Sequence, residues 1–284
     1  MDKIKNYLPE LIYLILLIST GLIPNYGALD RIATQWFYLS LLNTIGLSIF
    51  LVDKKYKHVS FKSLIKFKPL LFLMLFIVWG ISSYLYAINS TEVIVKIIRW
   101  IQLPISLSIL MMFFNTNQLN YVSIISVVVT CILLVELYFS YSTYFDLTKF
   151  TSYNFSYANL IKGATGNKNI NAASILIKIP FVLLLLFRQK TLIIKILLGL
   201  LIAFTCYLVL ILSARAAILS LIVITLVLSI KTIAFLISKR NFPKDLSSLI
   251  MILSFAFPIL LFSLQYSSNN TASIVNRVST INTE

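Results

Sequence analysis

Long apolar runs alternate with short polar segments from one end of the chain to the other. Each run is close to the ~20 residues that an α-helix needs to cross a bilayer's hydrocarbon core. The pattern predicts an all-α polytopic membrane protein with about nine transmembrane helices. The predicted spans are 8–24, 34–52, 69–88, 93–114, 121–143, 171–188, 195–212, 216–237 and 247–264.

The composition agrees with this fold class. Hydrophobic residues make up 59% of the 284 positions, against ~45–50% apolar residues in soluble domains. The net charge of +15 arises from cations clustered between the apolar runs, which favours membrane topology and membrane lipids over nucleic acid as a partner. Cys131 and Cys206 fall inside apolar spans, so we expect both to be small core residues. We therefore predict neither a metal site nor a cofactor.

The lysine and arginine distribution predicts the orientation. With the N-terminus in the cytoplasm, 14 basic residues of the connecting segments are cytoplasmic and six are outside, as the positive-inside rule requires. Nine spans then place the C-terminus outside, giving an N-in, C-out topology. The cytoplasmic loop 53–68 holds six lysines. It fits either a plain positive-inside anchor or an interfacial helix on the anionic inner leaflet.

Three charged residues lie at one depth inside the predicted spans. Arg99, Glu136 and Lys178 are each about eight residues from the outer helix end, roughly 12 Å at ~1.5 Å per residue. A buried unpaired charge is costly, so we expect a shared cavity open to the outer face, with Glu136 paired to a cation. The excess positive charge favours phosphate or pyrophosphate. Interhelical salt bridges or snorkelling side chains, without a ligand, are the alternative.

The outer loop 144–170 precedes the sixth span and ends in glycines and asparagines. Its tyrosines and phenylalanines are typical of an interfacial belt, with sugar stacking as the alternative. Asn167 is expected to cap the following helix. The first turn of that helix, with Lys168, Asn169 and Asn171, would present N–H groups and a positive dipole end to a phosphate. The alternative is that the asparagines only cap the helix.

Arg215 is the only charged residue between Ile196 and Ile230. One helix over that stretch would be ~50 Å long, against a hydrocarbon core of ~30 Å. We therefore predict two spans that meet near Arg215 at the outer boundary. An arginine at this position indicates an anionic partner.

Two segments in this order resemble the O-antigen ligase and O-antigen polymerase superfamily. One is Gly166-Asn167-Lys168-Asn169-Ile170-Asn171-Ala172-Ala173 followed by Ile179-Pro180, and the other is Leu212-Ser213-Ala214-Arg215-Ala216-Ala217. The resemblance implies the N-terminal part of a GT-C-like fold in the bacterial inner membrane. It also implies a metal-independent glycosyltransferase that takes a glycan from undecaprenyl pyrophosphate and passes it to lipid A core or to a growing polysaccharide.

In such a protein the arginine matching Arg215 binds the donor pyrophosphate. We group Arg99, Lys178, Lys168 and Asn169 with it as candidate pyrophosphate ligands. The supporting residues are Glu136, Asn167, Asn171 and Arg277. No pattern identifies a catalytic residue.

The family usually carries a large periplasmic loop after this point, with further arginines and a histidine. Here the bundle is predicted over 1–264, and 265–284 is expected to be the start of that loop or a tail. The chain thus looks like a member truncated before the loop. The alternatives to a glycosyltransferase are a transporter or flippase of an anionic lipid-linked glycan, and an inactive truncated membrane protein.

Overall fold

The computed structural model describes residues 8–24, 32–52, 67–115, 121–149, 155–238 and 247–266. Within these ranges the regular structure is helical and contains no strand, as predicted for an all-α protein. Most of the basic loop 53–68, Arg277 and the rest of the C-terminal tail lie outside the described residues.

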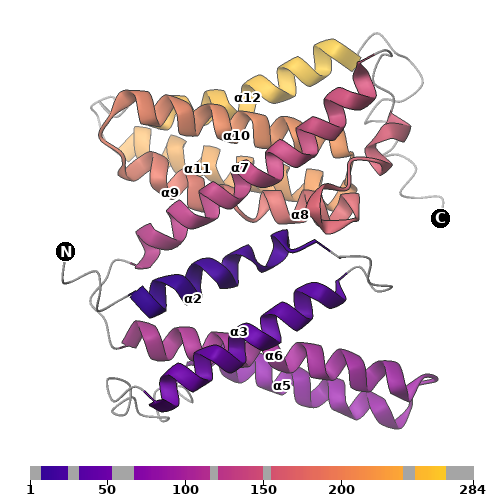
Figure 1. Cartoon of the computed structure of the whole chain (residues 1–284). Coiled ribbons are helices and arrows are strands. Elements are labelled where there is room, and N and C mark those ends of the chain that lie inside the picture. The colour runs from indigo at the N-terminus through magenta and orange to yellow at the C-terminus, as the bar shows by residue number, and fades with distance from the viewer. Residues whose placement is uncertain are drawn as a thin grey trace. The chain divides into compact units, whose positions relative to one another are not determined.

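Each predicted apolar span contains a helix (Figure 1). The helices are α2 (Leu8–Ser19), α3 (Ala33–Val52), α5 (Lys68–Ser82), α6 (Ser90–Asn115), α7 (Tyr121–Thr148), α8 (Lys168–Leu176), α9 (Ile179–Arg188), α10 (Leu192–Leu212), α11 (Arg215–Ser238) and α12 (Ser247–Tyr266). Short 3-10 turns are η1 (Thr20–Leu22), η3 (Ser83–Leu85), η4 (Phe155–Asn159) and η5 (Gly163–Thr165).

Six helical stretches of the described chain are long and apolar enough to cross a membrane. They are Ala33–Val52, Lys68–Leu85, Ser90–Phe113, Val122–Thr148, Lys168–Arg188 and Leu192–Leu212. Three further apolar stretches are shorter, namely Leu8–Leu22, Arg215–Ile230 and Ser247–Phe262. Helices suit the bilayer because they satisfy their backbone N–H and C=O groups internally. The chain is a multi-pass membrane protein, while nine spans and an N-in orientation stay predictions.

The helices group into two compact units, Met1–Tyr121 and Val122–Glu284. In the first unit, α2, α3 and α5 all pack against α6. Tyr13, Leu42, Ile109 and Phe113 form its core. Gly46 permits the close approach of α3, because a Cβ there would lie 2.7 Å from Tyr13 Cε2.

A buried hydrogen-bond network joins α2, α3 and α6. Asn43 Oδ1 accepts from the Tyr13 hydroxyl at 2.9 Å and from the Ser106 hydroxyl at 2.8 Å. Asn43 Nδ2 donates to the Gln102 side chain at 3.0 Å. Glu10, one turn before Tyr13, is also buried at 2% exposure. Sequence reasoning missed all of these polar groups, although a polar residue inside an apolar run is the signal that would find them.

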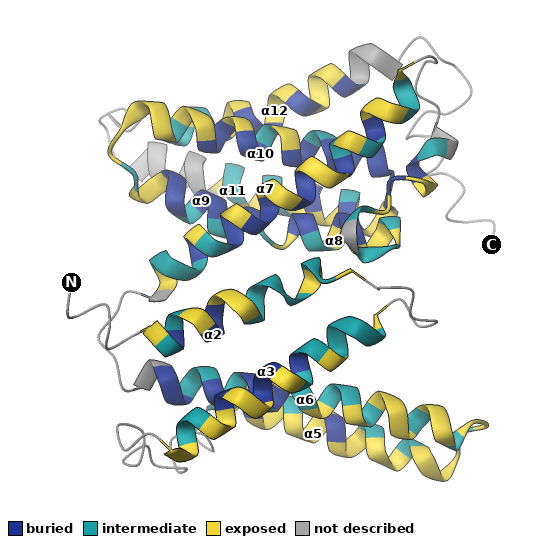
Figure 2. Cartoon of the chain, in the orientation of Figure 1, coloured by how far each residue is buried: buried dark blue, intermediate teal, exposed yellow. Residues whose placement is uncertain are grey.

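In the second unit α10 is the central helix. Its buried residues run along nearly its whole second half, including Ile202, Leu208 and Ile211 (Figure 2). The helices α8, α9, α11 and α12 pack around it. Gly199 permits the close approach of α12, since a Cβ there would clash with Ile250 Cγ2.

The structure differs from prediction around residues 144–188. Helix α7 continues to Thr148, so the connection to α8 is shorter than the predicted loop 144–170. Tyr144 is buried in the core instead of standing in an interfacial belt. The predicted span 171–188 begins earlier and is broken between Leu176 and Ile179. Pro180 has no N–H to continue the ladder and its ring disfavours the preceding helical turn, so the chain restarts as α9.

Candidate functional site

The predicted break near Arg215 is confirmed. Helix α10 ends at Leu212, and Ser213 adopts a left-handed conformation with φ 50°. Helix α11 begins at Arg215, and its first hydrogen bonds include that from the Ile218 N–H to the Ala214 carbonyl. A left-handed residue other than glycine or asparagine is strained by ~1–3 kcal/mol and occurs where the surroundings hold it. The turn brings the start of α11 back beside α10.

A cavity of about 760 Å³ lies beside this turn in the second unit. It is lined by α8, the break before α9, and the first turns of α11. The lining residues are Lys168, Asn169, Ala173, Leu176, Ile177, Pro180, Ser213, Ala214, Arg215, Ala216, Ala217, Ser220 and Ile224. The cavity is therefore amphiphilic, with Lys168, Asn169 and Arg215 at the helix starts and mostly small or aliphatic side chains along the rest of its lining.

Two helix N-termini meet at its polar part. Lys168 and Asn169 stand at the start of α8, and Arg215 is the first residue of α11. The N-terminal turn of a helix carries about half a positive charge and N–H groups without helical acceptors. With an exposed guanidinium and an ammonium added, the arrangement favours an anion with several oxygens. Such a site suits phosphate or carboxylate chemistry.

The loop before α8 is shaped by its glycines and capped as predicted. Gly163 and Gly166 have positive φ, 54° and 71°, which few other residues adopt without strain. Asn167 is the N-cap, and its side chain accepts from the Asn169 N–H at 2.9 Å. The Thr165 hydroxyl donates to the Asn167 carbonyl at 2.9 Å. These bonds hold the start of α8 at the cavity.

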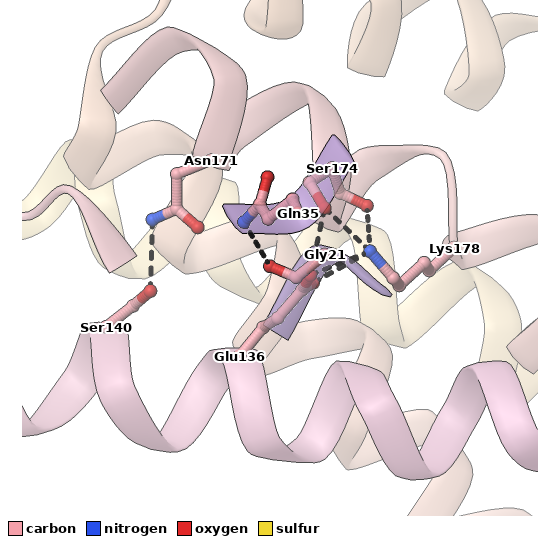
Figure 3. Close-up of polar contacts among 7 residues, drawn as sticks. All are labelled: Gly21, Gln35, Glu136, Ser140, Asn171, Ser174 and Lys178. Atoms are coloured by element: carbon pink, nitrogen blue, oxygen red, sulfur yellow. Dashed lines mark hydrogen bonds and ion pairs between the residues drawn. The ribbon is translucent and has the colours of Figure 1, made fainter. Parts of the chain in front are cut away.

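The expected pairing of Glu136 with a cation is confirmed, and the cation is Lys178 (Figure 3). Lys178 Nζ lies 2.9 Å from Oε2 and donates to Oε1 at 3.0 Å. Only Oε1 receives a hydrogen bond of good geometry, so the Oε2 contact is ionic. Ser174 donates to Oε1 at 2.9 Å, and its carbonyl accepts from Nζ at 2.9 Å. The side chains are 3% exposed for Glu136 and 12% for Lys178. The pair ties the α8–α9 break to α7, and Ser174 links α8 to the same carboxylate.

Asn171 makes a second polar link between the same helices. It is fully buried, and its Nδ2 donates to the Ser140 hydroxyl at 3.0 Å (Figure 3). Its Oδ1 has no hydrogen-bond partner. A Cβ at Gly163 would lie 2.5 Å from that oxygen. Only glycine leaves room for this amide beneath the loop.

The structure divides the predicted site residues between two faces of α8. Lys168 and Asn169 line the cavity with Arg215. Asn171 lies on the face of α8 that is against α7, and Glu136 is on α7 itself. Lys178, in the break between α8 and α9, is directed to Glu136 and does not line that cavity. Lys178 thus pairs with a carboxylate on α7, while Lys168 and Asn169 face the cavity.

Two predicted residues fall elsewhere. Arg99 is on α6 in the first unit and is half-buried. Arg277 lies outside the described residues. Ser213, Ala216 and Ala217, which were noted from the sequence only as part of a motif, also line the cavity. Sequence reasoning missed Ser174. The i, i+4 spacing of Ser174 and Lys178 was the available signal for it.

Among the residues that the structure describes, no group of three or more histidine, cysteine or acidic side chains could hold a metal ion. Comparison with protein-family models, curated proteins and solved structures finds no match for the chain. The resemblance to O-antigen ligases and polymerases thus stays a prediction.

Proposed function

We propose that the chain is an O-antigen ligase-like membrane glycosyltransferase, or part of one. It would transfer a glycan from undecaprenyl pyrophosphate to lipid A core or to a growing polysaccharide. The observation that carries the proposal is the cavity in which Arg215, Lys168 and the starts of α8 and α11 converge.

The cavity's two-part character supports an amphiphilic ligand. A polyprenyl pyrophosphate combines a highly charged group with an apolar chain. The guanidinium of Arg215 would grip phosphate oxygens in a bidentate fork, which a lysine cannot do. Lys168 and the two helix N-termini would add fixed positive charge. Leu176, Ile177 and Ile224 offer apolar surface to the first isoprene units.

The buried pair of Glu136 and Lys178 would act indirectly. It ties the α8–α9 break to α7, while Ser174 and Asn171 of α8 add their bonds to Glu136 and Ser140 of α7. A rigid α8 keeps Lys168 and Asn169 opposite Arg215, since positions on an anchored helix are more precise than positions on a loop.

The proposal includes the N-in, C-out topology, which would put the cavity at the periplasmic face of the bacterial inner membrane. Its support is the excess of lysine and arginine in alternate connecting segments. Reporter fusions after Ser60 and after Asn269 should report the cytoplasm and the periplasm respectively. Reports from the same side would overturn the topology and the periplasmic site with it.

The functional test compares Arg215→Lys and Arg215→Ala with Arg188→Ala, an exposed arginine in the last turn of α9. Purified protein in nanodiscs is titrated with undecaprenyl pyrophosphate and with undecaprenol. We expect both Arg215 variants to lose most of the preference for the pyrophosphate, with Arg188→Ala unchanged. Surface polysaccharide display in cells should likewise fall with both Arg215 variants and stay unchanged with Arg188→Ala. Wild-type binding by Arg215→Ala would overturn the proposal, whereas pyrophosphate-specific binding with glycan movement but no transfer would identify a flippase.

A further inference from the structure

A second cavity, of about 570 Å³, lies in the first unit along α5 and α6 beside α3. Its floor includes Leu70, Ile77 and Met112, which are each 8% exposed or less. Along the rim, Leu71 and Val78 are 47% and 61% exposed. The cavity is thus a groove with a closed floor and an open side.

The groove offers nothing polar to a ligand. Ser108 is the one lining residue with a polar side chain. Its hydroxyl donates to the Pro104 carbonyl at 2.7 Å. All other lining residues are aliphatic, methionine or proline, and α5 and α6 both belong to candidate membrane spans. An apolar groove within membrane spans is filled by hydrocarbon, because a water molecule there would find no partner for its hydrogen bonds.

The groove has the length of one lipid chain. Its lining on α5 runs from Leu70 to Ile81, which is about 16 Å at ~1.5 Å per residue. That is half of a hydrocarbon core of ~30 Å, and so the depth of one leaflet. A single acyl chain entering from the Leu70 end would lie along the whole groove.

The entrance carries positive charge. Lys68 is exposed and stands two residues before Leu70. Helix α5 contains no acidic residue. The preceding sequence adds five lysines within 53–66, but these lie outside the described residues and form no part of the site. Charge at this end selects an anionic headgroup over a zwitterionic one.

We propose that the groove binds one anionic phospholipid, with an acyl chain along α5 and α6 and the headgroup phosphate at Lys68. The site is independent of the Arg215 cavity and of the proposed function. It gives the lysine-rich entry to α5 a ligand in addition to its role in membrane orientation.

The test uses the full chain purified in detergent and observed by native mass spectrometry. The probes are phosphatidylglycerol and phosphatidylcholine with identical acyl chains. Wild-type protein should retain one phosphatidylglycerol, preferred over phosphatidylcholine by about fivefold, since one lysine near a lipid surface contributes ~1 kcal/mol. The preference should fall in about 0.5 M NaCl, where the screening length is only a few ångströms.

Two matched pairs of variants locate the ligand. Lys68→Gln should bind both lipids equally, and Lys190→Gln, an exposed lysine of the second unit, should keep the preference. Leu71→Trp fills the groove and should lose saturable binding of either lipid. Leu75→Trp, one turn away and outside the lining, should bind as the wild type does.

Equal retention of the two lipids by the wild type would overturn the proposal, as would a preference that survives Lys68→Gln. Lys68 is exposed, so its variant decides the matter even where Leu71→Trp fails to fold. Dimers that retain no lipid would show that a second copy of the chain covers the groove, which also overturns the proposal.

Discussion

Replacing Glu136 by glutamine should strongly destabilise the second unit. Glutamine keeps the shape of the side chain and removes its charge, so the ammonium of Lys178 loses its counter-ion. The Lys178 side chain is 12% exposed, and its ammonium lies 2.9 Å from the carboxylate. Its remaining contacts, the Ser174 carbonyl at 2.9 Å and hydroxyl at 2.7 Å, are uncharged.

Breaking a buried ion pair by removing one partner costs about 3–5 kcal/mol. The unfolded reference state of a membrane protein also finds polar partners, which reduces the measured cost of polar contacts. We therefore expect about 3 kcal/mol for Glu136→Gln and a similar loss for Lys178→Met. The double variant buries no charge, so it should lose about 3–4 kcal/mol in total, a coupling of about 2–3 kcal/mol.

The assay is a double-mutant cycle on the free energy of unfolding of purified protein in bicelles. The matched control is the pair of Glu92 and Lys96, which are 2.7 Å apart with side chains 57% exposed. Its coupling should fall within the error of the measurement, because water screens exposed charges. Additive losses at Glu136 and Lys178, or single losses no larger than those of the control, would refute the reasoning.

Three further predictions concern the same free energy of unfolding. Gly199→Val should cost about 1–3 kcal/mol by overpacking α10 against α12. Gly21→Val should cost clearly less, because a Cβ added there has no atom within 4 Å, and equal costs would contradict the close packing. Gly163→Ala should cost more than about 1 kcal/mol, because φ is 54° and the new Cβ meets the Asn171 amide; a neutral or stabilised variant would contradict this. Asn43→Leu should cost about 1–3 kcal/mol, because it leaves the buried Tyr13 hydroxyl without its acceptor; no loss would show that the network contributes little.

Local features of the chain could be predicted from the sequence. The helix break before Arg215 follows from the length of one apolar run against the thickness of a bilayer. Asn167 was identifiable as an N-cap because capping involves residues only two positions apart. Even the pairing of Glu136 with a cation was predictable, since a buried carboxylate requires one.

Which partners meet was beyond the sequence. Arg99 and Lys178 were equally suitable as the cation for Glu136, and packing of α8 on α7 selected Lys178. The same packing turned Lys178 away from the cavity where Lys168 and Arg215 meet. The Asn43 network likewise joins residues as far apart as Tyr13 and Ser106.

The sequence by itself thus determined the membrane class, the apolar helices and the break before Arg215, because apolar run length and capping act over one helix at a time. Only the tertiary structure decided that α8 carries a cavity-lining face and an α7-binding face, and which distant helices share a polar contact. The physical reason is that contacts between helices depend on rotation about each helix axis. A shift of one residue turns a side chain by about 100°, and packing of the whole unit sets that rotation.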